Sequence, residues 1–244
     1  MSIPTDGVLV PPRVRRLAGD DDLVPVWRNG IGGLTFRATG ARGIRYVKWG
    51  PRNDETTVEA EAERLAWAGR FISVPRVITV GGDDTEEWLV TAAMPGENAV
   101  APRWIAEPEV AVTAIGAGLR SFHDRLPVDD CPFSWRVADR LEKAARRGIR
   151  VPEVLREAPR EHDLVVCHGD ACSPNTVLTD AGSVAGYVDL GALGVADRWA
   201  DIAVAAMSVE WNYGPGWTET LLAAYGIDPD AQRMTYYREL WNAT

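Results

Sequence analysis

Cysteine is scarce in this chain, with three residues among 244. Cys131, Cys167 and Cys172 are too irregularly spaced for a disulfide framework and lack the C-x-x-C spacing of a zinc site. Long apolar runs are also missing, because no stretch approaches the roughly eighteen residues of a membrane-spanning helix, and we find no signal peptide. We therefore expect a cytoplasmic protein with no membrane partner, in which Cys167 and Cys172 are small buried side chains in a reducing compartment.

Cations are outnumbered, with 26 Lys and Arg against 35 Asp and Glu and a formal net charge of −9. Nucleic-acid binding relies on cationic contacts with phosphates, so this balance argues against a nucleic-acid partner and is compatible with a small polycationic substrate. The apolar content of 46% is adequate for a packed core in one large or two small domains. We expect a monomer or a weak homodimer.

The strongest pattern lies near the two-thirds point of the chain. It reads Val165-Val166-Cys167-His168-Gly169-Asp170-Ala171-Cys172-Ser173-Pro174-Asn175, followed later by Val188-Asp189-Leu190-Gly191. The spacing from Asp170 to Asn175 equals that of the kinase catalytic loop H-R-D-x-x-x-x-N, and Asp189 stands where the Asp of D-F-G would. Strands are predicted over 163–167 and 184–188, the second of which delivers Asp189.

Phosphoryl transfer requires an acceptor for the substrate hydroxyl proton and hard oxygen ligands for Mg²⁺. Asp170 is the candidate acceptor, and Asn175 and Asp189 are the candidate metal ligands. A His-Gly-Asp sequence alone is more often an ordinary turn. The joint pattern is far rarer, so we interpret these residues as the centre of a magnesium-dependent small-molecule kinase.

With these motifs, the segment from Leu164 to Ala205 resembles the aminoglycoside phosphotransferase family, including the 3′-phosphotransferases and their streptomycin-kinase relatives. The stretch from Gly194 to Ala203 also matches, and a weaker likeness extends from the Trp27 region to Tyr237. The resemblance implies an α+β, bilobed, protein-kinase-like fold. Residues 1–94 would form a nucleotide-binding N-lobe, a small antiparallel β-sheet with one key helix. Residues 95–244 would form a larger, mainly helical C-lobe with the catalytic loop, metal site and substrate pocket.

The same resemblance implies ATP or GTP as co-substrate and assigns supporting roles around the loop. Asp201 would accept backbone amides of the catalytic loop, and His168 would support it structurally. Arg after Asp-Leu-Gly is usual in the family, whereas this chain has Ala192. Asp197 and Arg198 are interpreted as an ordinary surface pair.

A glycine cluster, Asn29-Gly30-Ile31-Gly32-Gly33, lies between two apolar segments and predicts a hairpin tip. In a kinase, the backbone amides of such a tip, here those of Gly30 and Gly32, cover the nucleotide phosphates. A plain hairpin is the alternative. The family usually has serine where this chain has Gly32.

Lys48 lies in a predicted strand from which its ammonium can reach the α- and β-phosphates. A helix is predicted from Thr56 or Thr57 onward, and the family pattern makes Glu61 the partner of Lys48. Glu63 remains an alternative partner, as does a solvated face for all the glutamates of this helix.

Further strands are predicted at 75–80 and 87–91, and further helices at 110–126, 137–147, 199–209 and 218–225. By alignment with the family, backbone groups of Thr91 and Ala93 contact the adenine. The first 19 or so residues, rich in proline and arginine, are expected to be partly mobile.

Candidate substrate residues are Glu153, Glu157 and Glu161, spaced to share one helical face, and the carboxylate of Thr244. The function implied is transfer of the γ-phosphate to a hydroxyl of an aminoglycoside antibiotic, conferring resistance, with the 3′-hydroxyl of a kanamycin-like compound as first choice. Alternatives are a streptomycin kinase, a kinase of another small-molecule alcohol, and a nucleotide-binding regulator or pseudokinase without turnover.

Overall fold

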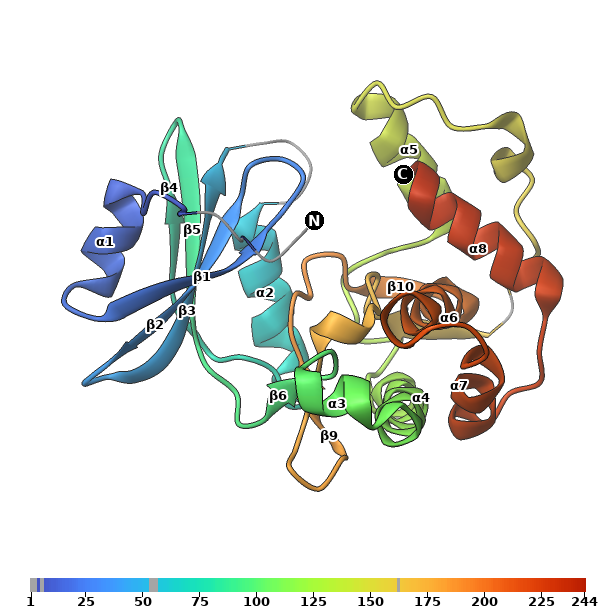
Figure 1. Cartoon of the computed structure of the whole chain (residues 1–244). Coiled ribbons are helices and arrows are strands. Elements are labelled where there is room, and N and C mark those ends of the chain that lie inside the picture. The colour runs from blue at the N-terminus through green and yellow to red at the C-terminus, as the bar shows by residue number, and fades with distance from the viewer. Residues whose placement is uncertain (1–3, 5–6, 53–56, 162) are drawn as a thin grey trace. The chain divides into compact units, whose positions relative to one another are not determined.

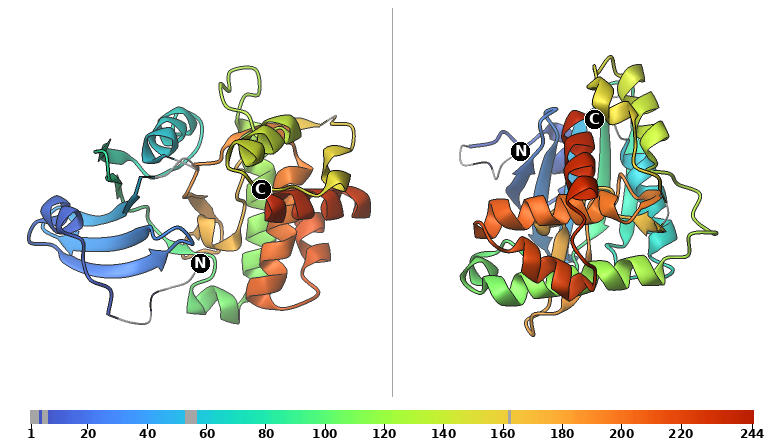
Figure 2. Two further views of the ribbon diagram at one scale, coloured as in Figure 1. Left: turned by 90° about the horizontal axis from the view of Figure 1, so that it is seen from above. Right: turned by 90° about the vertical axis from the view of Figure 1, so that its right-hand side faces the viewer.

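The computed structural model describes residues 4, 7–52, 57–161 and 163–244, and the chain divides into two compact units (Figures 1 and 2). The first unit comprises Met1–Gly69 and Pro75–Met94, and the second comprises Arg70–Val74 and Pro95–Thr244. Within the described ranges, no helix is both long and apolar enough to cross a membrane. The first unit is a sheet with two helices, and the second is mainly helical.

The sheet of the first unit has five antiparallel strands in the order β1-β2-β3-β5-β4. They are β1 (Asp22–Arg28), β2 (Leu34–Gly40), β3 (Gly43–Pro51), β4 (Val77–Gly82) and β5 (Glu86–Ala92). The predicted hairpin over the glycine cluster and the predicted strands are confirmed.

Two helices cover opposite faces of this sheet (Figure 1). Helix α1 (Pro12–Ala18) packs on the face that buries Phe36, Val47 and Val90. Because side chains alternate along a strand, Lys48 points to the other face, where α2 (Val58–Ala68) contacts β4 and β5.

Helix α1 corrects the expectation of a mobile N-terminal stretch for residues 12–18. Pro12 occupies the first helical turn, where its missing N–H costs nothing. Val14 is fully buried, and Arg13 donates to Glu86 at 2.7 Å and to Asp83 at 2.6 Å on β5 and the turn before it. The helix depends on these tertiary contacts, which composition does not reveal.

Helix α2 begins as predicted. The hydroxyl of Thr57 accepts the N–H of Ala60 at 3.1 Å, which makes Thr57 the N-cap, whereas Thr56 lies outside the described residues. Val58 and Leu65 face the sheet and are buried, and Glu61 follows one turn after the cap.

The second unit contains most of the helices. They are α3 (Pro102–Ala106), α4 (Pro108–Arg125), α5 (Val137–Arg146), α6 (Trp199–Tyr213), α7 (Thr218–Tyr225) and α8 (Ala231–Ala243). Helix α7 packs along α4 and contacts α6, and α8 packs against α6 (Figure 2). The predicted helices are confirmed, whereas α8 was not predicted.

Helix α6 is buried along its whole stretch from Trp199 to Val209. Such all-round burial needs an apolar helix, and Asp201 is the charged exception in this stretch, fully buried beside the catalytic loop. Within the helix predicted over 110–126, α4 contributes Ile115, Leu119 and Phe122 to the interior, at the spacing of one helical face.

Short strands hold the catalytic loop. β7 (Leu164–Cys167) pairs with β10 (Gly194–Asp197), and β8 (Thr176–Leu178) pairs with β6 (Glu97–Asn98) and β9 (Val184–Tyr187). The loop therefore begins after β7 and ends in a short 3₁₀ helix, η2 (Ser173–Asn175), just before β8. Asp189 follows two residues after β9.

Two expectations for the second unit are wrong. Glu153, Glu157 and Glu161 do not share a helical face, because a 3₁₀ helix, η1, spans only Glu153–Arg156 and irregular chain follows. Pro159 explains the break, since it lacks an N–H and restricts the residue before it.

Asp197 is not part of a surface pair. It is fully buried, accepts the N–H of Trp199 at 3.0 Å and forms a 2.6 Å ion pair with Arg233 of α8. Arg198 instead lies 3.7 Å from Asp163.

Candidate active site

Asp201 fixes the start of the catalytic loop. Its Oδ2 accepts the backbone N–H of His168 at 2.6 Å, and its Oδ1 accepts that of Gly169 at 2.9 Å. Nε2 of His123, on α4, lies 3.0 Å from the same Oδ2, and Nδ1 of His123 contacts the hydroxyl of Tyr225 at 2.8 Å. The bracing contacts predicted for Asp201 are therefore present, and His123 extends them to two further helices.

The imidazole of His168 links the loop to the chain after β9. Its Nε2 donates to the carbonyl of Val188 at 3.0 Å, and its Nδ1 accepts the N–H of Asp170 at 3.3 Å. Because Val188 immediately precedes Asp189, this ring connects the two segments that carry the candidate catalytic carboxylates.

The backbone geometry of this loop requires glycine at position 169. Its φ is +83°, and a Cβ built there would lie 2.3 Å from the carbonyl oxygen of Ala192. Only glycine combines this backbone conformation with so close an approach. The turn thereby directs Asp170 out of the strand.

Asp170 is held by two side chains of its own loop. The amide nitrogen of Asn175 donates to its Oδ2 at 3.1 Å and to its carbonyl at 2.9 Å, and the thiol of Cys172 donates to its Oδ1 at 3.0 Å. Burial, followed by the negative charge of Asp189, raises the pKa of Asp170 above its ordinary value. A carboxylate with a raised pKa is a stronger proton acceptor than an ordinary aspartate.

Asp189 adopts the left-handed backbone conformation, with φ of +62°, alone among the described non-glycine residues. Such a conformation is uncommon for a residue with a side chain and is found disproportionately at functional sites. The N–H of Val188 donates to the carbonyl of Asn175 at 3.0 Å. This bond ties Asn175 to the segment that presents Asp189.

The oxygen donors of this region suit Mg²⁺. The amide nitrogen of Asn175 faces Asp170, so its carbonyl oxygen is the edge of the amide directed away from that carboxylate. Together with the carboxylate of Asp189 it could supply one neutral and one anionic hard ligand, a set that Mg²⁺ accepts when phosphates and waters complete its shell.

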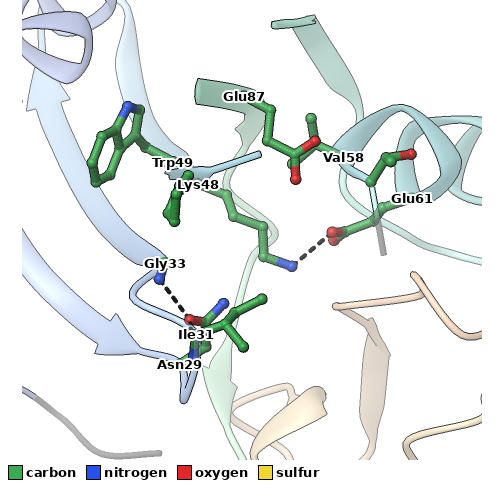
Figure 3. Close-up of a pocket in the computed structure, with 11 residues that line it drawn as sticks. Asn29, Ile31, Gly33, Lys48, Trp49, Val58, Glu61 and Glu87 are labelled. Atoms are coloured by element: carbon green, nitrogen blue, oxygen red, sulfur yellow. Dashed lines mark hydrogen bonds and ion pairs between the residues drawn. The ribbon is translucent and has the colours of Figure 1, made fainter. Parts of the chain in front are cut away.

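In the first unit, Lys48 of β3 and Glu61 of α2 form an ion pair of 2.6 Å between Nζ and Oε2. The pairing predicted from sequence is present, in place of the alternative with Glu63, whose side chain is exposed. Both residues line a pocket that also receives Glu87 of β5 (Figure 3). Exposed ion pairs contribute little energy, so this half-buried pair acts mainly by fixing the position of the ammonium.

The glycine tip between β1 and β2 is shaped by Asn29, whose role the sequence did not reveal. Oδ1 of Asn29 accepts the N–H of Ile31 at 3.1 Å and that of Gly33 at 2.6 Å (Figure 3). Gly30 lies in this turn, and Gly32 has φ of +90°. A phosphate bound by this tip would use other amides or displace the Asn29 side chain.

Thr91 and Ala93 lie at and just beyond the end of β5. Thr91 pairs with Tyr46 of β3 and Val77 of β4. The N–H of Ala93 donates to the carbonyl of Ile44 at 3.0 Å. An adenine bound at Ala93 must therefore compete with Ile44 or use the Ala93 carbonyl.

The candidate substrate residues are dispersed along the second unit. Glu153 is exposed and lies 3.2 Å from Arg156, Glu157 is exposed, and Glu161 lies 3.6 Å from Arg136. Thr244 is held by two arginines near the end of the chain: Arg140 donates to its hydroxyl at 3.0 and 2.5 Å, and Arg147 to its main-chain oxygen at 3.0 Å. Substrate amines would compete with these arginines for Glu161 and Thr244.

Cys172 was interpreted from the sequence as a filler, yet its thiol contacts Asp170. Burial, then the charge of Asp170, raises the pKa of this thiol. The signal available in the sequence was its place two residues after the candidate base. Glu87 carried no such signal, because its contact with α2 depends on how β5 is aligned against that helix.

Comparison with known proteins agrees with this geometry. The model of the phosphotransferase enzyme family matches residues 27–237. An aminoglycoside 3′-phosphotransferase of Streptomyces fradiae is 40% identical over 80% of this chain and 84% of its own length. A streptomycin 3″-kinase of Streptomyces griseus is 34% identical over 90% of this chain and 91% of its own length.

Solved structures give the same result. An aminoglycoside phosphotransferase of Streptomyces rimosus, in complex with ADP and streptomycin, is 30% identical, with a TM-score of 0.71 over 93% of this chain and 94% of that chain. Such likeness confirms the predicted kinase-like α+β fold. On the extent of the family match and the identity to its relatives, the chain belongs to the phosphotransferase enzyme family.

Proposed function

We propose that this protein is a kinase that transfers the γ-phosphate of ATP or GTP to a hydroxyl of an aminoglycoside, with the 3′-hydroxyl of a kanamycin-like compound as the acceptor. The 3′-phosphotransferase relative at 40% identity supports this acceptor, and the ADP in the related complex supports ATP as the donor. Residues 1–94 would bind the nucleotide, and residues 95–244 would carry the catalytic loop, the metal ligands and the acceptor pocket.

The observation that carries the proposal is the environment of Asp170. Its carboxylate is oriented by Asn175 and Cys172, and its pKa is raised by burial and by Asp189. Asp170 accepts the proton of the acceptor hydroxyl as that oxygen attacks the γ-phosphorus, and the bond from phosphorus to the β,γ-bridging oxygen breaks to release the nucleoside diphosphate.

The remaining residues position groups and balance charge. Asn175 and Asp189 would hold Mg²⁺, which when bound neutralises charge on the nucleotide phosphates. Lys48, oriented by Glu61, would contact the phosphates through its ammonium. Asp201 and His168 keep the loop in place, so that Asp170 stays aligned with the acceptor.

Acceptor-dependent formation of ADP tests this function. We expect ADP to form with kanamycin B and not with its 3′-deoxy analogue, since that compound lacks the acceptor hydroxyl. Equal rates with both compounds would show that a hydroxyl other than the 3′-hydroxyl is phosphorylated. No turnover with any aminoglycoside, despite nucleotide binding, would favour a regulator or pseudokinase. Expression in a susceptible bacterium should raise its resistance to the compounds that are phosphorylated.

Streptomycin is the second candidate acceptor, because a streptomycin 3″-kinase matches over 90% of this chain. The same assay decides between them. Faster turnover with streptomycin than with kanamycin B would assign the protein to the streptomycin kinases.

A further inference from the structure

Glu87 is a buried carboxylate to which the proposed mechanism gives no role. It is the second residue of β5, is 4% exposed, and lines the pocket that contains Lys48 and Glu61 (Figure 3). Val58 of α2 lines the same pocket as Glu87, and its backbone N–H is a hydrogen-bond donor to the Glu87 carboxyl that lowers the pKa of this group. Oε2 of Glu87 is buried with no hydrogen-bond partner among the residues that the structure describes.

The contact with Val58 matters because of where Val58 lies. It is the first residue of α2, and the first N–H groups of a helix have no partner within the helix. Thr57 satisfies the N–H of Ala60 from within the same segment, whereas Glu87 satisfies that of Val58 from a neighbouring strand. Glu87 therefore attaches the first turn of α2 to the sheet, and Glu61 follows three residues after Val58.

Charged groups around Glu87 come from three elements. Lys48 of β3 and Arg52 just beyond it lower the pKa of Glu87, while Glu59 of α2 raises it together with burial, which is the largest effect. The carboxylate also lies at a helix N-terminus, where negative charge is favourable. Burying an ionisable carboxyl costs free energy of folding, so an apolar side chain would fill this position at lower cost if packing were its only role.

We propose that Glu87 is a positioning residue of the nucleotide site: it fixes the N-terminal turn of α2, keeps Glu61 against Lys48, and thereby sets the affinity for the nucleotide phosphates. The inference rests on the proposed function in one respect, namely that Lys48 contacts those phosphates. Glu87 itself touches neither substrate in this account. Its effect passes through Val58 and Glu61.

The test is calorimetric titration of ADP with Mg²⁺ into the full-length protein, with no acceptor needed. Glu87→Ala and Glu87→Leu remove the acceptor of the Val58 N–H, and Leu fills the space if Ala fails to fold. We expect both to raise the ADP Kd about threefold to tenfold, since loss of a helix cap reduces the population of the binding-competent α2. Glu87→Gln keeps a carbonyl for that N–H and should bind within about twofold of wild type by the same reasoning.

Glu63→Ala and Glu63→Gln serve as matched controls, because Glu63 is an exposed glutamate of the same helix, and neither should change the Kd. Wild-type affinity in Glu87→Ala or Glu87→Leu would overturn the inference. So would a Gln variant as weak as the Ala variant, since the Val58 acceptor would then be irrelevant. If the wild-type protein does not bind ADP at all, the proposed function fails before the inference is reached.

Discussion

Replacing Asp201 by Asn should destabilise the protein and misplace the catalytic loop. Asp201 is fully buried and accepts two backbone N–H groups of the loop, from His168 and Gly169, while Nε2 of His123 approaches the same carboxylate. An amide retains one acceptor oxygen and turns the other into an NH₂ group that faces an N–H. One buried donor is therefore left without an acceptor in the variant.

The magnitude follows from these contacts. A hydrogen bond to a charged group contributes about 1.5–3 kcal/mol, and an unsatisfied buried donor costs about 1–3 kcal/mol. We therefore expect Asp201→Asn to lower the free energy of unfolding by roughly 2–4 kcal/mol, and Asp201→Ala by more. At about 2–4 °C per kcal/mol for a chain near this size, the Asn variant should melt on the order of 10 °C lower.

Calorimetric melting and steady-state turnover measure the two consequences. The control is Asp124→Asn, on α4, which removes an exposed i,i+4 pair with Arg120 and should leave the melting temperature nearly unchanged. At temperatures below the melting range, Asp201→Asn should also turn over more slowly than wild type, because the loop that carries Asp170 loses an anchor. A variant that melts within 2 °C or so of wild type with full turnover would refute this account of the loop.

Three further predictions concern single residues. Gly169→Ala should cost at least about 2 kcal/mol of stability, measured by denaturant unfolding, because its Cβ would meet the Ala192 carbonyl at a positive φ; wild-type stability would contradict the tight turn. The pKa of Glu87 is raised by burial, so the native state binds more protons than the unfolded chain between about pH 4.3 and the raised value, and stability falls as pH rises through that window. Glu87→Gln cannot titrate and should therefore gain melting temperature relative to wild type between pH 4 and pH 8, whereas a constant difference would contradict the shift. The thiol of Cys172, whose pKa is raised by burial and by Asp170, should react with iodoacetamide at pH 8 at least tenfold or so more slowly than N-acetylcysteine; mass spectrometry of its peptide checks this, and equal rates would exclude the shift.

The sequence revealed the parts of the site that depend on local spacing. The interval from Asp170 to Asn175 and the strand that delivers Asp189 are local features, and the backbone bond from Val188 to Asn175 follows once the hairpin β8–β9 forms. Lys48 and Glu61 were paired from the family pattern, and a start of the helix at Thr56 or Thr57 was predicted from the residue type. These inferences needed no knowledge of distant contacts.

Features set by tertiary contacts could not be inferred in the same way. The Pro- and Arg-rich composition of α1 predicted a mobile stretch, because its ion pairs from Arg13 to Glu86 and Asp83 are visible only in the structure. Asp197 looks like a surface residue until Arg233, 36 positions later, is found against it. The helical face expected for the glutamates from 153 to 161 followed a spacing rule that ignored Pro159.

The contacts of the candidate substrate residue Thr244 also depend on residues distant in the chain. Arg140 and Arg147 reach Thr244 from about one hundred positions away, so these cationic partners of Thr244 could not be inferred from its neighbours in the chain. Cys172 was interpreted as a filler although it lies two residues after Asp170, and its contact with that carboxylate was missed. Glu87 was missed because nothing in the sequence places this strand residue beside α2.

The central claim, that Asp170 is the proton acceptor of a phosphoryl transfer, is tested most directly by Asp170→Asn. Turnover with the best acceptor should fall by about two to four orders of magnitude, the usual contribution of a general base, while the ADP Kd stays near the wild-type value. Turnover within a factor of a few of wild type in this variant would contradict the mechanism.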